Sequence, residues 1–269
     1  MRLQHGEVQA CGLDWRDASS PGRVVNLRMC ALSLSMLLAA GACGRHAAPP
    51  VAPHAGRAAA VPESAPAVEI RYPALPAGAR SLDRALQAYA ASERESFLAQ
   101  VAAQAGSTGD AASPWRLHLS FRVEGDGRDF LGVLAQGEAY TGGAHGNPLL
   151  ASFVWHRRSD RVLALSDLFV RPDAALQRLS THAAAALRSR AGADAARIAD
   201  GTAPRAENYA VFLIDLDAAG RACGLRLLFP AYQVAPYAAG LQQVAVPAPQ
   251  FVDLLRPEFR AAFLAPKPG

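Results

Sequence analysis

The stretch that decides the fold reads WRLHLSFRVE and occupies residues 115–124. Five apolar side chains alternate strictly with five polar ones along it. Successive side chains of a strand point to opposite faces of a sheet, so the alternation predicts a strand with one face in the core and one in solvent. Residues 125–129 (GDGRD) predict a turn, and residues 130–141 predict the antiparallel partner of this strand.

The segments around this hairpin predict a sheet flanked by helices. Further strands are expected at residues 68–72, 149–157, 162–165, 208–216, 224–229 and 241–246. Helices are expected over residues 81–104, with Ser81 as N-cap, over 172–190, and over 250–263. Strands pair as neighbours and helices fall between the pairs. This order is typical of an α+β fold, with a largely antiparallel sheet and helices packed on it, in a single compact domain of two subregions.

The N-terminal region contains LRMCALSLSMLLAAGAC, residues 27–43. Its apolar run covers about 14 residues, whereas a transmembrane helix needs about 20. The small residues before Cys43 are typical of a bacterial lipoprotein signal, in which the cysteine is lipidated and everything upstream is removed. Because residues 1–28 contain three acids, we expect the true translation start near Met29; the alternative is a cytoplasmic tail on a single-pass anchor.

This interpretation divides the chain into four parts. Residues 1–42 are a mis-assigned start plus signal peptide, and residues 43–67 are a Pro- and Ala-rich flexible tether. Residues 68–141 form an N-terminal subregion and residues 142–265 a C-terminal domain. Gly44 is not the aspartate that by convention retains a lipoprotein at the inner membrane. We therefore expect attachment to the outer membrane through Cys43, facing the periplasm.

Composition and cysteine usage narrow the function classes. The whole chain carries a net charge of +4, and removing residues 1–42 leaves about +3, from 23 basic and 20 acidic residues. No basic block interleaved with aromatic residues occurs, so nucleic-acid binding is not expected. Once Cys11 and Cys30 leave and Cys43 carries lipid, Cys223 is expected to be a lone buried thiol. No paired-cysteine or HExxH motif points to a metal, and no cofactor is expected.

Two loops have more specific sequences than ordinary connections. The first is YTGGAHGN, residues 140–147, whose glycines allow backbone conformations closed to other residues. The second is YQVAPYAAG, residues 232–240, which holds two tyrosines around a proline. Candidate ligand-binding residues in these loops are Tyr140, His145, Asn147, Tyr232 and Tyr237. Residues expected to set the loop conformations are Gly142, Gly143, Gly146, Pro236 and Gly240.

Both loops resemble the signature loops of the RsiV/PdaC-type extracytoplasmic domain of unknown function (domain of unknown function 3298, with its N-terminal partner region 4163). The resemblance covers residues 68–263 and also includes DLF at 167–169 and the segment 244–247. It implies binding at the cell envelope, because lysozyme is the ligand of RsiV and because the chemistry of PdaC belongs to a separate domain. An anti-sigma role is not implied, since a lipoprotein signal stands where RsiV has its membrane span.

These observations favour a non-catalytic binding module for an envelope ligand, with lysozyme or peptidoglycan fragments as candidates. One alternative is an envelope scaffold that meets an acidic protein through Arg157, Arg158 and Arg161. Another is a hydrolase in which His145 acts as general base with Tyr140, Tyr237 or Asp167. Since no nucleophile motif or second histidine supports it, no catalytic residue is predicted.

Overall fold

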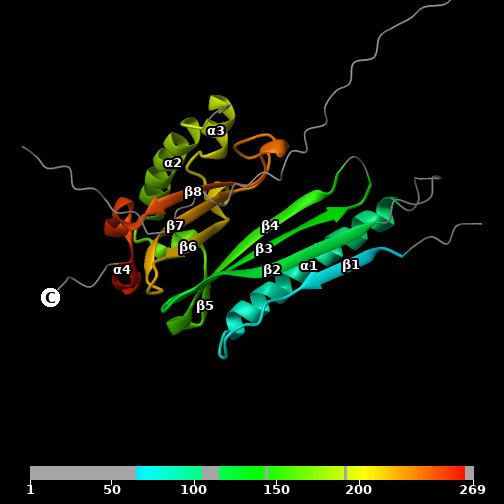
Figure 1. Ribbon diagram of the computed structural model, residues 1–269, viewed down its shortest axis with the longest axis horizontal. Coiled ribbons are helices and arrows are strands. Elements are labelled where there is room, and N and C mark those ends of the chain that lie inside the picture. Colours follow the sequence, from blue (N-terminus) through cyan, green and yellow to red (C-terminus); the bar gives the residue numbers. More distant parts are fainter. Residues whose placement is uncertain (1–64, 105–114, 143–144, 191–192, 264–269) are drawn as a thin grey trace, which may run out of the picture. The chain divides into compact units, whose positions relative to one another are not determined.

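The computed structural model describes residues 65–104, 115–142, 145–190 and 193–263, which belong to one compact unit. The predicted α+β class is confirmed, but the strands form two sheets rather than one. Figure 1 shows both. The five-stranded sheet has the order β1 (Ala67–Arg71), β2 (Arg116–Asp126), β3 (Phe130–Tyr140), β4 (Asn147–His156) and β5 (Arg161–Leu163). The three-stranded sheet has the order β6 (Phe212–Leu216), β7 (Ala222–Phe229) and β8 (Gln242–Pro247). All pairs are antiparallel except β1 with β2.

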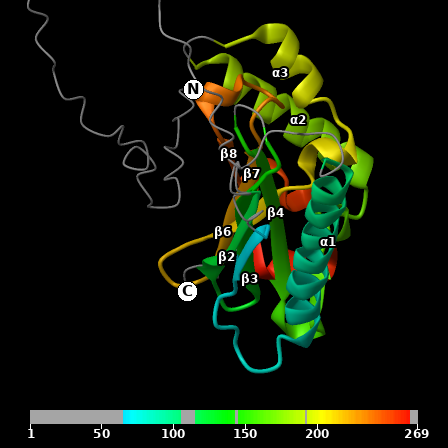
Figure 2. The same ribbon diagram turned by 90° about the vertical axis from the view of Figure 1, so that its right-hand side faces the viewer.

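The helix α1 (Arg80–Gln104) lies along one face of the five-stranded sheet (Figure 2). Its buried side chains recur at helical spacing: Leu82, Leu86, Ala90, Phe97 and Val101. The alternation in β2 places the apolar side chains of that strand, Leu119 and Phe121 among them, in the same core cluster as the first half of the helix. The strand pattern that predicted one wet and one dry face therefore describes β2 correctly.

The start of α1 differs from the prediction. The helix begins at Arg80, and Ser81 is a donor there rather than the cap. Asp160 accepts hydrogen bonds from the Ser81 backbone N–H at 3.2 Å and from the Ser81 hydroxyl at 2.8 Å. The same carboxylate oxygen accepts from Trp155 Nε1 at 2.8 Å. The exposed N–H groups at a helix start need acceptors, and here a residue 79 positions away supplies one.

The second core lies between the three-stranded sheet and α2 (Pro172–Arg188), α3 (Ala195–Gly201) and α4 (Pro257–Phe263). The helix α3 was not predicted. The helix expected over residues 250–263 is wrong in its first half, where the structure has two 3-10 turns, Ala248–Gln250 and Val252–Leu254. Leu255 is extended, with φ −66° and ψ 147°. Arg256 precedes Pro257, and the residue before a proline disfavours the helical conformation, so α4 starts only at the proline.

The two sheets meet through an apolar cluster of Leu134, Leu213 and Leu228. Beside it, Arg226 on β7 pairs with Asp215 on β6 at 2.7 Å and with Glu124 on β2 at 3.5 Å. These carboxylates and the guanidinium are largely covered, which reduces solvent screening of their attraction. The junction therefore combines packing with charge pairs that link the sheets.

Cys223 also differs from the prediction. It lies on β7 with a partly exposed side chain and forms a disulfide, so it is neither fully buried nor a free thiol. Its three potential partners in this chain are Cys11, Cys30 and Cys43, which lie outside the described residues. The predicted signal and most of the predicted tether also lie outside them. Within the described ranges, no helix is both long and apolar enough to span a membrane.

Candidate functional site

The first signature loop connects β3 to β4. Gly142 has φ +111°, a conformation that L side chains rarely adopt, so glycine is required there. At Gly146 space is tight, because a Cβ atom there would lie 3.1–3.2 Å from the Glu138 side chain, which would have to shift by a few tenths of an ångström. His145 is exposed, and its Nδ1 lies 3.1 Å from the carbonyl oxygen of Gly146. A carbonyl can only accept, so Nδ1 is the donor in this contact. Gly143 lies outside the described residues.

The second signature loop connects β7 to β8 and is held by its own backbone. The Tyr232 N–H donates to the Ala235 carbonyl at 3.0 Å, although Tyr232 itself has φ +74°. Pro236 begins a single 3-10 turn, Tyr237–Ala239, with φ −60°. Gly240 ends this turn with φ +63° and ψ −158°, a combination suited to glycine. The loop therefore has a defined shape before any ligand arrives.

Residues of α3 and of the 3-10 turn Ala206–Tyr209 fix this loop from outside. Gln233 Nε2 donates to the carbonyl oxygens of Gly201 at 2.8 Å and Asn208 at 3.0 Å. The Arg197 guanidinium donates to the Tyr232 carbonyl at 3.1 Å. A small cavity of about 100 Å³ lies between the loop and the end of α2, where burial lowers the pKa of Arg190. Sequence reasoning missed these supporting residues.

The structure brings three of the five candidate binding residues together. The ring of His145 stacks on that of Tyr237, with centroids 4.6 Å apart and planes 17° apart. Tyr237 in turn contacts Tyr232 at 5.5 Å. Tyr232 is 50% exposed and Tyr237 39% exposed. We refer to His145, Tyr232 and Tyr237 as the aromatic patch, a surface built from loops about 90 residues apart in sequence.

Tyr140 and Asn147 lie at the ends of the two strands that the first loop joins. Tyr140 ends β3, and the guanidinium of Arg116 lies 5.5 Å from its ring centroid. Asn147 starts β4 opposite Ala139. Because neighbouring residues on a strand alternate in direction, Tyr140 and Asn147 project to opposite faces of the sheet. They cannot both contribute to one contact surface on one face.

The residues considered for the two alternative functions have local partners. Asp167 accepts from the Ala164 N–H at 2.9 Å and lies 3.8 Å from Arg161, so its contacts belong to the turn before α2. Arg157 pairs with Asp126 across the β2–β3 turn, and Arg158 lies 3.8 Å from Asp129. Among the described residues, no group of three or more His, Cys, Asp or Glu side chains gathers as a metal site would require.

Comparison with known proteins places this geometry in a family context. Residues 166–248 match the family described as "Protein of unknown function (DUF3298)". A stretch of 145 residues is 27% identical to the peptidoglycan-N-acetylmuramic acid deacetylase PdaC of Bacillus subtilis (strain 168). It covers 53% of this chain and 30% of PdaC, so the chain corresponds to less than a third of that protein.

Two solved structures are also similar. A DUF3298 family protein from Pseudomonas aeruginosa PAO1 is 19% identical, with a TM-score of 0.40 over 54% of this chain and 65% of its own. A DUF3298 family member from Bacteroides fragilis NCTC 9343 is 17% identical, with a TM-score of 0.45 over 70% of this chain and 74% of its own. The matched segment, from the turn before α2 to the end of β8, contains the second signature loop. The predicted resemblance to a domain of unknown function is thus confirmed over residues 166–248, which match the DUF3298 family model, and the chain also has similarity to PdaC.

Proposed function

We propose that this protein is a lipid-anchored, non-catalytic binding module of the bacterial cell envelope, and that the aromatic patch is its ligand-contact surface. The observation that carries the proposal is the stacking of His145 on Tyr237 beside Tyr232. Half-exposed tyrosines on a surface supply large contact area together with a polar hydroxyl, and such residues dominate binding energy at interfaces.

The preformed loop conformation supports binding over a purely structural role. The 3-10 turn, the Gln233 anchor and the Arg197 bond hold the second loop without a ligand. A surface that is ordered beforehand loses less conformational entropy when it binds. If the tyrosines served only to pack the end of the sheet, they would be buried as Tyr209 is, rather than left half-exposed.

Peptidoglycan fragments are the ligand class we favour. The name of PdaC describes a protein that acts on peptidoglycan, and it shares 27% identity with this chain over 145 residues. Sugar rings present C–H faces to aromatic side chains and hydroxyl groups to Nε2 of His145. Lysozyme is the second candidate ligand. Since lysozyme is cationic, a domain of net charge near +3 would not attract it electrostatically.

The proposed location is the outer membrane, with the protein facing the periplasm on a lipid attached to Cys43. The potential intrachain partners of the Cys223 disulfide, Cys11, Cys30 and Cys43, are all available only in the full, unprocessed sequence. Removal of residues 1–42 and lipidation of Cys43 would withdraw all three intrachain partners. The processed protein would therefore carry Cys223 as a thiol or pair it with another molecule.

The alternatives have weaker support in the geometry. Of the partners considered for a hydrolase, Tyr237 stacks on His145, whereas the Asp167 carboxylate is engaged at its own turn by the Ala164 N–H. A scaffold that used Arg157 or Arg158 would have to compete with Asp126 and Asp129 for them. A specific protein partner recovered without peptidoglycan or lysozyme binding would favour the scaffold.

The test is retention of the full chain on insoluble peptidoglycan and on immobilised hen lysozyme. We expect retention on peptidoglycan that falls at least fivefold in Tyr237→Ala, with the urea unfolding midpoint little changed. Val170→Ala is the matched control, because Val170 is an exposed apolar side chain outside both loops. Equal retention of the wild type, Tyr237→Ala and Val170→Ala would refute the assignment to the patch. No retention on either material would refute the ligand classes.

A further inference from the structure

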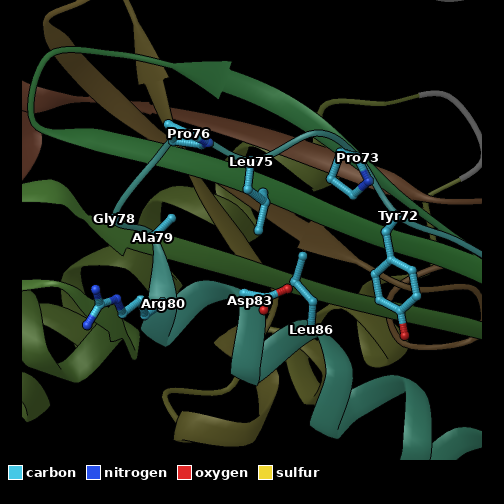
Figure 3. Close-up of a pocket in the computed structure, with 9 residues that line it drawn as sticks. All are labelled: Tyr72, Pro73, Leu75, Pro76, Gly78, Ala79, Arg80, Asp83 and Leu86. Carbon is cyan, nitrogen blue, oxygen red and sulfur yellow. The ribbon is translucent and has the colours of Figure 1, made fainter.

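A cavity of about 310 Å³ opens between the end of β1 and the first turns of α1, outside both signature loops. Figure 3 shows the residues that line it. Its apolar wall consists of Tyr72, Pro73, Leu75, Pro76, Ala79 and Leu86. The polar groups at its lining are Asp83 and Arg80, both from the first turn of α1. The volume lies at the lower end of the range for small-molecule sites, so it fits a small ligand or one unit of a longer one.

Tyr72 forms one end of the cavity and has a fixed orientation. Its ring stacks on Phe121 of β2, with centroids 5.1 Å apart and planes 8° apart. Only one face of an aromatic ring can be covered by such a stack, and Tyr72 is still 49% exposed. The connection that follows holds Pro73 and Pro76, which restrict its backbone. A flat aromatic surface is therefore presented by a stiff segment.

Asp83 supplies the acceptor. In Figure 3 its carboxylate lies beside Leu86, between Tyr72 at one end and Arg80 at the other. One oxygen, Oδ2, accepts from Gln87 Nε2 at 2.9 Å, which orients the group. The pKa of the Tyr72 hydroxyl is raised, mainly by its partial burial and secondly by the negative charge of Asp83, in keeping with their shared location. The start of α1 is already held by Asp160, so its N-terminal capping does not depend on Asp83.

We propose that this cavity binds a single ring of a saccharide, whose C–H face packs on Tyr72 while its hydroxyl groups donate hydrogen bonds to Asp83. A sugar ring combines an apolar face with a rim of hydroxyl donors. That combination matches an aromatic wall set beside a carboxylate acceptor. This site uses no residue of the aromatic patch and does not depend on the proposed function.

The test is calorimetric titration of the full chain with N,N′-diacetylchitobiose and with cellobiose. For one sugar ring we expect a Kd on the order of 1 mM. Asp83→Asn is expected to weaken binding at least tenfold, because an amide replaces the charged acceptor. Tyr72→Ala removes the stacking surface and should have a similar effect, whereas Tyr72→Phe, which keeps the ring, should bind within about threefold of the wild type.

Asp173→Asn is the matched control, since Asp173 occupies the first turn of α2 and is exposed. It is expected to bind like the wild type. Urea midpoints of all variants establish that each one is folded. The proposal is overturned if neither disaccharide binds at about 50 mM, far above the expected Kd. It is also overturned if binding persists unchanged in both Asp83→Asn and Tyr72→Ala.

Discussion

Gly201 lies outside the second signature loop in sequence, yet replacing it by alanine should displace that loop. Gly201 is the buried last residue of α3, and its neighbour across the gap is the backbone of Gln233. A Cβ atom at position 201 would lie 2.2 Å from the Gln233 carbonyl oxygen and 2.8 Å from its carbonyl carbon. Contacts under 3.0 Å essentially never occur for real Cβ atoms, so the gap must open by at least 0.8 Å.

The cost follows from what would have to give way. The obstructing atoms are backbone, and Gln233 is tied back to Gly201 and Asn208 by two hydrogen bonds. Overpacking of this kind costs about 1–3 kcal/mol. Alanine gains up to about 1 kcal/mol of helix propensity over glycine, but less at the last residue of a helix. We expect Gly201→Ala to lower the free energy of unfolding by about 1–3 kcal/mol and to displace Tyr232, which adjoins Gln233.

The assay combines urea unfolding with the ring proton resonances of Tyr232 and Tyr237, which report the stack with His145. Gly78→Ala is the matched control: Gly78 has φ +91°, and a Cβ atom there would meet nothing within 4 Å. It should cost about 1–2 kcal/mol of backbone strain and leave the rings unaffected. If Gly201→Ala left both the unfolding midpoint and the ring resonances at their wild-type values, the close approach of α3 to the loop would be incorrect.

Three further predictions test other parts of the molecule. Tyr209→Phe should lower the free energy of unfolding by about 1 kcal/mol in urea titrations, because the buried Tyr209 hydroxyl donates to the Thr202 carbonyl at 2.6 Å; an unchanged midpoint would contradict that bond. Hydrogen bonds lower the folded-state pKa of Asp160, so its contribution to stability is complete above about pH 4 and is lost as the pH falls through the lowered value; Asp160→Asn should flatten this part of the urea-midpoint profile, and an identical profile would refute the role. Non-reducing peptide mapping should find a Cys223 disulfide in the unprocessed chain and none within chains that start at lipidated Cys43; an intrachain disulfide in the lipidated form would contradict the processing scheme.

The fold class was predictable because most strands carry a local signal. In β2 every second side chain is apolar, and the hairpin partner follows a glycine-rich turn. Neighbouring segments of the sequence therefore predict this pairing. The helix α3 gives no comparable signal. Its seven residues, AARIADG, contain Ile198 as the single large apolar side chain. An apolar pattern must repeat over several turns before it predicts a helix, so a two-turn helix that is held by packing cannot be predicted from periodicity.

The division into two sheets was not predictable for a different reason. Strand alternation shows which side chains are buried but not against what. The backbone N–H of Phe212, at the start of β6, donates to the Ser152 hydroxyl on β4 at 2.8 Å, a side-chain contact rather than a ladder bond. The cap on α1 is similar, since Asp160 and Ser81 are 79 positions apart. Such contacts are properties of the folded chain, and no local pattern encodes them.

At the candidate site, local sequence patterns identified the two loops but not which of their residues meet. Glycines, a proline and tyrosines marked the two loops as unusual, and the family resemblance rests on the same residues. Which of them meet depends on the sheets, because the first loop joins strands of the five-stranded sheet and the second joins strands of the three-stranded sheet. The stack of His145 on Tyr237 is therefore set by the junction at which Leu134 packs on Leu213 and Leu228. The aromatic patch therefore depends on how the two sheets are held together, which no pattern within either loop encodes.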